Sequence, residues 1–415
     1  MRRYNILIIS HGHPDFNIGG AEKVAYLMYK GFNELKDYVN GAYFLFPSFK
    51  YANGRIELYK EKEYFWHVNM SDYLFFRSNQ RYFIDTFFVP FLKTINPDII
   101  HINHYIHIGL EIIPVIKRTL LNSKIILTLH EYLPICYHNG QMVKRYDFSL
   151  CFKSSPEECN VCFPEVSKEL FFLRKHRIMS IFEDVDIFVA PSNFLKSRFV
   201  EWGISQDKIK VIENGFPKFT KLPPRKLKMG EGRNRFAFFG QINIYKGLHI
   251  VLEGLTSLPP SKLKKIKLYI NGPKIENLSP QIKKLIEKPL EHLSKTGVIS
   301  WIGTYRTIEE QKYRMLNTDW VIVPSIWWEN SPLVIQEAFG MGRPVICSNI
   351  GGMAEKVKDG ITGIHVPVGD PIAWAEKLIE LADIENIPLW DNLYNNLPSP
   401  PYYLDVAKKY LDLIS

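Results

Sequence analysis

The stretch that most constrains the fold of this chain is residues 319–344, DWVIVPSIWWENSPLVIQEAFGMGRP. It begins with an apolar, β-branched run, Trp320–Val323, which has the length of a buried parallel strand. A loop holding Glu329 follows, and Ser331 is placed to cap a helix whose first residue is Pro332, which has no N–H to leave unpaired. Two glycines end that helix before the next apolar run. The stretch therefore predicts a strand–loop–helix–strand unit, and an open α/β sheet binds ligands at the loop end of such a unit.

The start of the predicted helix suits an anionic ligand. The N–H groups of Leu333 and Val334 have no partner within the helix and lie at its positive end, a favourable place for a phosphate. Glu329 lies in the loop before the helix, and Glu337 lies about one and a half turns inside it. One carboxylate can therefore face a sugar while the other reaches hydroxyls further along the same ligand.

Glu329 and Glu337 form an E-x7-E pair set in ENSPLVIQEA-x4-RPVI. The spacing alone is common, but this context resembles the donor site of retaining glycosyltransferases of family 4, which have the GT-B architecture. The resemblance implies an α/β fold with two Rossmann-like, doubly wound domains facing a cleft. It also implies transfer of a sugar from a nucleotide-diphosphate donor to an acceptor hydroxyl. The structural alternative is a pair of solvated glutamates on an ordinary Rossmann-like helix.

Other positions match motifs of the same family. Lys246, at a strand-to-helix turn after FAFFG, matches the lysine that pairs with the donor diphosphate, where negative charge grows as the sugar–phosphate bond breaks. His130 matches the histidine of the H-D/E motif, which contacts the donor sugar near its anomeric side. Gly20 matches a GG-x-E element that faces the diphosphate and acceptor, although a Gly-Gly pair can equally mark a tight turn. The implied catalytic residues are Glu329, Lys246 and His130, and the implied donor-binding residues are Gly20, Gln241, Lys246, Ser331, Leu333, Val334 and Glu337.

One position departs from the family. Gln241 stands where relatives usually have arginine, and glutamine brings neither a charge nor a bidentate fork. Arg343, at the end of the key helix, is a candidate compensator, although a cation at a helix C-terminus is equally an ordinary feature. Two other functions therefore stay open. They are a non-catalytic sugar- or nucleotide-binding relative, and a GT-B phosphorylase or epimerase acting on a phosphorylated sugar.

Four of the five cysteines lie close together in the sequence: Cys136, Cys151, Cys159 and Cys162. The last two have the C-x-x-C spacing of a zinc knuckle, and the first two can complete a tetrahedral thiolate site. We expect a structural zinc that pins an insertion at residues 131–165 and performs no chemistry, with no catalytic metal elsewhere. Unliganded thiols and an iron–sulfur cluster are the alternatives. The histidines at 101, 104 and 107 have no fixed ligand spacing and are treated as ordinary residues.

Composition indicates an ordinary soluble protein of two domains. The chain has 415 residues, too many for one core, with 46% hydrophobic and 23% charged residues. No apolar run reaches the ~18 residues that span a bilayer. The start, MRRYNILIIS, runs straight into a strand without a cleavage site, so a cytoplasmic location is expected. The net charge of +9 favours an anionic partner, and no nucleic-acid recognition motif is present.

Two segments are candidates for peripheral contact with the inner face of a membrane. Residues 64–92 are crowded with aromatic side chains, which either pack in a core or dip into a bilayer. Residues 169–182 set the run RKHR between apolar pairs, a pattern typical of a basic face on anionic lipid or of a solvated helix. The expected partners are a nucleotide-diphosphate sugar of UDP or GDP type and a saccharide or lipid-linked saccharide acceptor. The expected setting is surface polysaccharide or lipopolysaccharide assembly.

The domain boundaries follow from composition and the family pattern. Residues 1–216 are expected to form an N-terminal acceptor domain, and residues 236–396 a C-terminal nucleotide-sugar donor domain. Between them, residues 217–235 are rich in Pro, Gly and Lys without periodicity, which is typical of a linker. Residues 397–415 are expected to form a helix that returns to the N-terminal domain, as in GT-B folds.

Overall fold

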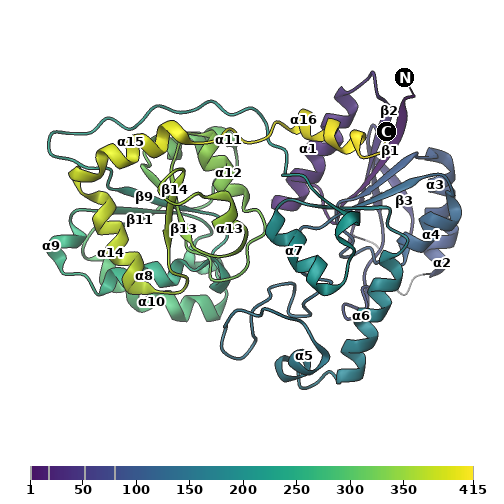
Figure 1. The fold of residues 1–415 in the computed structure, drawn as a ribbon, viewed down its shortest axis with the longest axis horizontal. Coiled ribbons are helices and arrows are strands. Elements are labelled where there is room, and N and C mark those ends of the chain that lie inside the picture. The colour runs from purple at the N-terminus through teal and green to yellow at the C-terminus, as the bar shows by residue number, and fades with distance from the viewer. Residues whose placement is uncertain (1, 17–18, 51–52, 79–80, 415) are drawn as a thin grey trace. The chain divides into compact units, whose positions relative to one another are not determined.

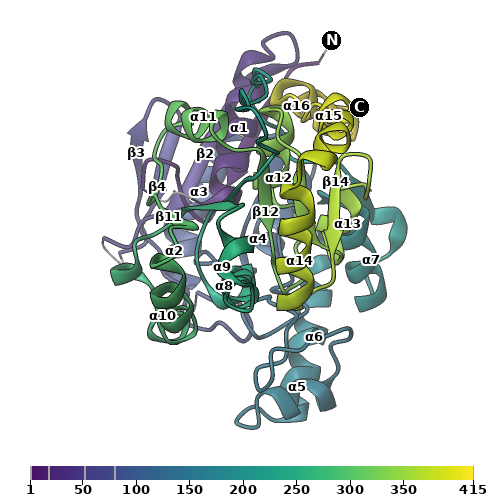
Figure 2. The ribbon, with the colours of Figure 1, turned by 90° about the vertical axis from the view of Figure 1, so that its left-hand side faces the viewer.

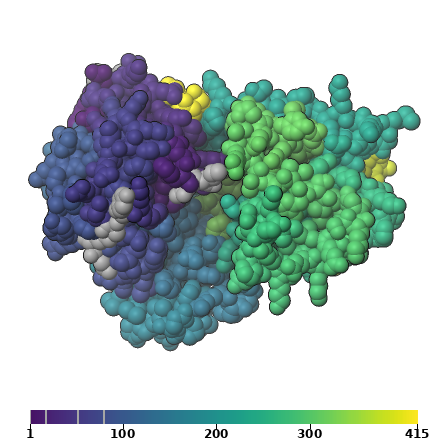
Figure 3. All heavy atoms as spheres, turned by 180° about the vertical axis from the view of Figure 1, so that it is seen from behind, coloured from purple at the N-terminus to yellow at the C-terminus, as the bar shows by residue number. Residues whose placement is uncertain are grey.

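A computed structural model of the protein describes residues 2–16, 19–50, 53–78 and 81–414 (Figure 1). The chain divides into two compact units. The first unit consists of Met1–Pro217 together with Pro401–Ser415, and the second unit is Lys218–Pro400. Each unit is built on its own largely parallel sheet covered by helices, which confirms the predicted α/β class. Side chains fill the spaces between the ribbons of each unit (Figure 3).

The first unit contains an eight-stranded sheet in the order β3-β4-β2-β1-β5-β6-β7-β8. Its strands are β1 (Tyr4–Ile9), β2 (Val39–Pro47), β3 (Ile56–Lys60), β4 (Glu63–Trp66), β5 (Ile99–Ile102), β6 (Lys124–Thr128), β7 (Ile187–Ala190) and β8 (Ile209–Val211). Neighbouring strands are parallel except for β3 and β4. The strand order reverses between β1 and β5, so the carboxyl ends of these strands form the switch point where such sheets bind ligands.

The helices of the first unit include one from each end of the chain. They are α1 (Gly20–Glu34), α2 (Arg81–Phe83), α3 (Val89–Ile95), α4 (Ile112–Thr119), α5 (Pro156–Cys162), α6 (Lys168–Phe182), α7 (Asn193–Trp202) and α16 (Tyr403–Asp412), with a π-helical turn at Ile84–Phe88. Helix α16 packs along α1 (Figure 1). Tyr403 donates a hydrogen bond to Glu34 at 2.6 Å, and the Tyr410 hydroxyl lies 3.0 Å from Thr128 of β6. The C-terminal helix is thus part of the first unit's core.

The second unit contains a six-stranded parallel sheet in the order β11-β10-β9-β12-β13-β14. Its strands are β9 (Arg235–Phe239), β10 (Lys267–Asn271), β11 (Ile299–Trp301), β12 (Trp320–Val323), β13 (Val345–Ser348) and β14 (Gly363–Val366). The apolar residues of the central strands β9, β12 and β13 are buried, as expected for strands covered on both faces, whereas those of the edge strand β11 are half-buried. The strand order reverses between β9 and β12, which places the switch point of this sheet there.

Helices cover both faces of the second sheet. They are α8 (Leu248–Thr256), α9 (Pro260–Leu263), α10 (Pro280–Ser294), α11 (Ile308–Leu316), α12 (Leu333–Gly340), α13 (Gly351–Lys356), α14 (Pro371–Ala382) and α15 (Ile387–Asn396). Helix α14 runs beside α8 (Figure 2) and buries Trp374 in the same cluster as Trp320 of β12. The segment expected to be a linker packs onto this unit, because buried Asp319 accepts hydrogen bonds from Arg225 and Arg233.

The aromatic segment 64–92 divides between core and surface. Trp66 and Phe88 are fully buried and stack with ring centroids 4.7 Å apart, whereas Tyr82 is 71% exposed. The prediction of a basic surface on residues 169–182 is wrong for Arg174, because this side chain of α6 is buried. Across the described ranges, we find no helix with the length and apolarity needed to cross a membrane.

Candidate functional site

Two loops meet at the switch point of the second sheet. One follows β9 and the other follows β12. The N–H of Ile326 donates to the carbonyl of Tyr245 at 2.9 Å, which joins the loops directly. Gly247 has φ +68°, and a Cβ built on it would lie 1.8 Å from the carbonyl oxygen of Pro324. Only glycine therefore allows the two loops to approach this closely.

This approach brings Lys246 and Glu329 into contact. Lys246 ends a short 3₁₀ turn, and its Nζ lies 2.6 Å from Glu329 Oε1. Ser325 donates a second hydrogen bond to the same oxygen at 2.8 Å. Glu329 is only 4% exposed, so its carboxylate depends on these two donors. The ammonium group also lies 5.5 Å from the centre of the Trp327 ring, within the range of a cation–π contact.

Helix α12 begins beside this pair, one residue later than predicted. Its first residue is Leu333, Pro332 is the N-cap in an extended conformation, and Ser331 precedes the cap. The prediction that Ser331 caps the helix is therefore wrong, since the rigid proline takes the capping position and lacks a capping side chain. Leu333 and Val334 occupy the first turn and are half-buried, so their N–H groups lie where an α-helix offers free donors.

Glu337 lies further along α12 and is half-buried. Gln311 of α11 donates to its Oε2 at 2.7 Å, which orients the carboxylate. Tyr305 is close by, and burial followed by the charge of Glu337 raises the pKa of its phenol, which stays neutral. Arg314 fixes the segment around Tyr305 by donating to the carbonyls of Gly303 at 2.6 Å and Thr304 at 2.8 Å.

Gln241 lies in the loop after β9 with an exposed side chain. The suggestion that Arg343 compensates for it is wrong, because the side chain of Arg343 is completely buried and is held by backbone carbonyls. Its guanidinium donates to backbone carbonyls, among them those of Met315 and Gly342 at 2.8 Å and Pro223 at 3.0 Å. Arg343 therefore ties the segment after Lys218 to the end of α12. Burial lowers its pKa to about 10, so it stays charged at neutral pH.

In the first unit, His130 follows β6 at the carboxyl end of the sheet. Its Nε2 lies 3.0 Å from the side-chain oxygen of Asn103, which follows the neighbouring strand β5. The amide group of Asn103 in turn donates to the carbonyl of Ala21 in the first turn of α1 at 3.2 Å. Burial lowers the pKa of His130 to about 3, so its imidazole is neutral. With the proton on Nε2, its Nδ1 is a hydrogen-bond acceptor.

Two histidine–carboxylate pairs stand beside His130. His11 Nε2 lies 3.3 Å from Glu22, His104 Nε2 lies 2.8 Å from Glu131, and the two imidazole rings are 4.2 Å apart. Sequence reasoning missed this group and treated His104 as an ordinary residue. The usable signal was position, because His11, His104 and Glu131 directly follow adjacent parallel strands, whose carboxyl ends share one edge.

Gly20 is the exposed first residue of α1, and Gly19 is its N-cap. A Cβ on Gly19 would lie 2.0 Å from the carboxylate of Glu22, which folds back over the helix start. Gly19 thus makes room for a carboxylate at the end of the helix where acidic groups are stabilised.

The expected zinc site is not supported. Within the described part of the chain, no three Cys, His, Asp or Glu side chains are arranged to hold a metal ion. Cys162 Sγ accepts from the N–H of Arg145 at 3.2 Å, and Cys159 Sγ lies 3.4 Å from Ser154 Oγ. Burial raises the pKa of Cys136 to about 12 and also raises the pKa of the Cys159 thiol. Among the described residues, the spacing of Cys136, Cys151, Cys159 and Cys162 therefore does not bring them together as a tetrahedral thiolate site.

Comparison with known proteins gives the family. The family model described as "Glycosyltransferase Family 4" matches residues 18–217, and "Glycosyl transferases group 1" matches residues 221–397. Lipopolysaccharide 1,2-N-acetylglucosaminetransferase of Salmonella typhimurium is 28% identical over 184 residues, 43% of this chain and 48% of that protein. D-inositol 3-phosphate glycosyltransferase of Corynebacterium glutamicum is 27% identical over 185 residues, 42% of this chain and 41% of that protein. The chain thus spans about half the length of these relatives.

Solved structures cover both units. Anabaena HepE in complex with UDP and glucose has a TM-score of 0.63 at 14% identity and covers 99% of each chain. Sucrose-phosphate synthase from Thermosynechococcus elongatus has a TM-score of 0.66 at 16% identity, covering 99% of this chain and 98% of that one. These likenesses confirm the predicted GT-B fold. Two consecutive family models of glycosyltransferases thus match most of the length of this chain, and its fold is GT-B.

Proposed function

We propose that the protein is a retaining glycosyltransferase that moves a sugar from a UDP-sugar to an acceptor hydroxyl. The observation that carries this proposal is the Lys246–Glu329 pair beside the start of α12, at the switch point of the second sheet. Anabaena HepE in complex with UDP and glucose supports a UDP-type donor, although GDP stays an alternative. The lipopolysaccharide-modifying relative supports a role in surface polysaccharide or lipopolysaccharide assembly.

In this proposal the ammonium group of Lys246 leaves Glu329 and binds the diphosphate of the donor. Two negatively charged phosphates are stronger partners for an ammonium group than one carboxylate. The N–H groups of Leu333 and Val334 add donors with fixed direction at the positive end of α12. Once released, Glu329 accepts hydrogen bonds from hydroxyls of the sugar. The pair in the free protein therefore holds both side chains in position before the donor arrives.

The remaining donor contacts come from flanking groups. Gln311 occupies one oxygen of Glu337, which leaves the other for the ribose hydroxyls. Gln241 offers an amide at the diphosphate, and Ser331 offers a hydroxyl just before the helix. From the first unit we assign His130, whose Nδ1 accepts from a sugar hydroxyl, and Gly20 at the start of α1.

The reaction requires no catalytic base from the protein. The bond between the sugar's anomeric carbon and the phosphate oxygen breaks, and a bond to the acceptor oxygen forms on the same face. The proton of the acceptor hydroxyl passes to the departing phosphate oxygen. Lys246 and the α12 N–H groups stabilise the charge that grows on that phosphate, the place where other enzymes use a divalent metal.

Calorimetric titration with UDP-glucose, UDP-galactose, UDP-N-acetylglucosamine and GDP-mannose tests the proposal. We expect saturable binding of one UDP-sugar, lost in Glu337→Ala, and a product whose anomeric configuration by NMR equals that of the donor. An inverted product would contradict the mechanism. Binding without turnover over many acceptors would instead favour a non-catalytic relative.

A further inference from the structure

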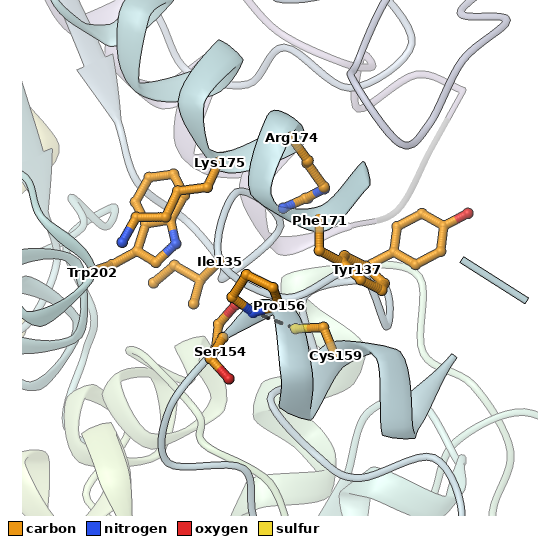
Figure 4. Close-up of a pocket in the computed structure, with 10 residues that line it drawn as sticks. Ile135, Tyr137, Ser154, Pro156, Cys159, Phe171, Arg174, Lys175 and Trp202 are labelled. Carbon is orange, nitrogen blue, oxygen red and sulfur yellow. Dashed lines mark hydrogen bonds between the residues drawn. The ribbon is translucent and has the colours of Figure 1, made fainter. Parts of the chain in front are cut away.

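A small pocket in the first unit is lined by cationic and aromatic side chains. It lies where α5, α6 and the end of α7 meet, and it is partly open to solvent. Figure 4 shows Arg174 and Lys175 reaching it from α6, opposite the segment that carries Ser154. Tyr137, Phe171 and Trp202 supply aromatic walls. No part of the proposed donor site in the second unit contributes to this pocket.

Arg174 is a buried cation without a negative partner. Its side chain is 4% exposed, and two of its guanidinium nitrogens donate to the backbone carbonyls of Leu133 and Pro134. Its Nε is buried and has no hydrogen-bond partner in the described chain. No carboxylate among the described residues forms an ion pair with it. Although burial lowers its pKa, an arginine keeps its charge at neutral pH.

The groups around Arg174 cannot neutralise it. Burial raises the pKa of Cys136 to about 12 and also raises the pKa values of Cys159 and Tyr105, so these neighbours are uncharged. Three carboxylates of the surrounding segments are paired elsewhere: Glu131 with His104, Glu158 with Lys144, and Glu165 with Arg145. Two others, Glu157 of α5 and Glu169 of α6, have exposed side chains. A buried, unpaired charge is strongly unfavourable, so the pocket lacks one negative group.

Lys175 adds a second cation at the mouth of the pocket. Its Nζ lies 5.7 Å from the centre of the Trp202 ring, and Figure 4 shows the side chain lying across the indole. The side chain is exposed, which lets it move onto an incoming ligand. Ser154 brings a hydroxyl, whose oxygen is 3.4 Å from Cys159 Sγ. The pocket thus combines two cationic donors from α6 with a neutral donor from the segment before α5.

We propose that this pocket binds a phosphate group, either free or esterified. Each terminal nitrogen of Arg174 donates one hydrogen bond, to Pro134 or to Leu133, and Nε has no partner, so the guanidinium keeps further N–H donors for an oxyanion. Arg174, Lys175 and Ser154 can each reach a different oxygen of a tetrahedral phosphate. Because Arg174 also holds the two residues that follow Glu131 and Tyr132, a bound phosphate steadies the loop after His130.

Calorimetric titration with sodium phosphate tests the proposal, in saturating UDP so that the donor site is occupied. We expect saturable binding to the wild-type protein and at least a tenfold weaker affinity in Lys175→Met. Lys168→Met is the matched control, because this exposed lysine lies on the same helix but outside the pocket. A parallel titration with glycerol phosphate separates the two sources, since tighter binding of the ester indicates an esterified ligand.

Absence of saturable phosphate binding in the wild-type protein would overturn the proposal, and so would equal losses in Lys175→Met and Lys168→Met. Arg174→Gln also removes the bonds to Leu133 and Pro134 and can unfold the loop. Ser154→Ala is therefore the second variant, and we expect it to weaken phosphate binding without lowering the thermal midpoint. A separate UDP titration reports on the donor site, so failure of one proposal is distinguishable from failure of the other.

Discussion

Lys246 and Glu329 show how a single ion pair links stability with function. The carboxylate is almost completely buried, while the ammonium group is partly exposed at 30%. The ammonium group of Lys246 can therefore move to a ligand at low cost, whereas the buried carboxylate of Glu329 needs hydrogen-bond donors to replace it. A buried carboxylate left with one hydrogen bond is unfavourable, so the pair itself favours any ligand that brings replacement donors for Glu329.

We expect Lys246→Met to lower the transfer rate by about 10²–10³-fold. We also expect it to destabilise the second unit by about 1–3 kcal/mol, since Glu329 keeps only Ser325 as donor. Adding Glu329→Gln should restore most of the thermal midpoint but none of the activity, because glutamine needs no counter-charge. Calorimetry of the single and double variants measures this coupling. Lys288→Met, an exposed lysine of the same unit, is the control. Additive effects on the midpoint would contradict the pairing.

The buried histidines of the first unit predict acid sensitivity. Burial lowers the pKa of His101 to about 3, below the ordinary value of 6.5. Below pH 6.5 the histidine is protonated in the unfolded chain but stays neutral in the folded chain. The contribution of His101 to the free energy of unfolding is therefore complete above pH 6.5 and is lost as the pH falls toward 3. One such histidine costs about 1.4 kcal/mol per pH unit in that window.

We therefore expect the thermal midpoint to fall between pH 7 and pH 4.5, and to fall less in His101→Gln. The amide of glutamine can replace the hydrogen bond to Thr128 that His101 makes at 2.7 Å. His292→Gln, at an exposed position of α10, is the control substitution. Equal slopes in wild-type protein and His101→Gln would show that His101 is not the titrating group.

At the scale of elements, the loops after β9 and β12 act as one unit because Gly247 lets them touch. We expect Gly247→Ala to push the loops apart, separating Lys246 from Glu329 and abolishing UDP binding in calorimetry. Gly360→Ala is the matched control, with nearly the same φ of +70° but nothing within 4 Å of the added Cβ. In both variants an alanine with positive φ destabilises the fold by about 1 kcal/mol. Only in Gly247→Ala does the added Cβ also clash with the carbonyl oxygen of Pro324.

The elements were largely predictable from the sequence, because buried parallel strands are continuous apolar runs. Trp320–Val323 is observed as predicted. Partners that lie far apart in the sequence were not predictable. Nothing local shows that Arg343 reaches back to Pro223, or that Arg174 turns inward to Leu133. The same limit applies to the cysteines, whose spacing in the sequence suggested a metal site that the described residues do not form.

At the scale of the whole molecule, the first unit is completed by the end of the chain. Helix α16 adds Val406, Ala407 and Tyr410 to the same apolar cluster as Met28 and Phe32 of α1. The second unit, Lys218–Pro400, has its own sheet and core. Stability of the first unit should therefore depend on residues separated from it by the whole second unit.

We expect removal of residues 401–415 to accelerate hydrogen exchange in α1 and β2, because the apolar face of α1 loses its cover. Binding of UDP by the second unit should remain, since none of its residues is removed. Mass spectrometry of the exchanged peptides measures both units in one experiment. Unchanged exchange in α1 would show that α16 contributes little to the first unit.

The position of α16 also sets an order of events during synthesis. Helix α1 leaves the ribosome early, but its partner helix is made only after the whole second unit has emerged. At translation rates of about 5–20 residues per second, the apolar side of α1 waits on the order of tens of seconds for its cover. The second unit can fold during this interval, so the uncovered apolar side of α1 is the surface we expect to be prone to aggregation.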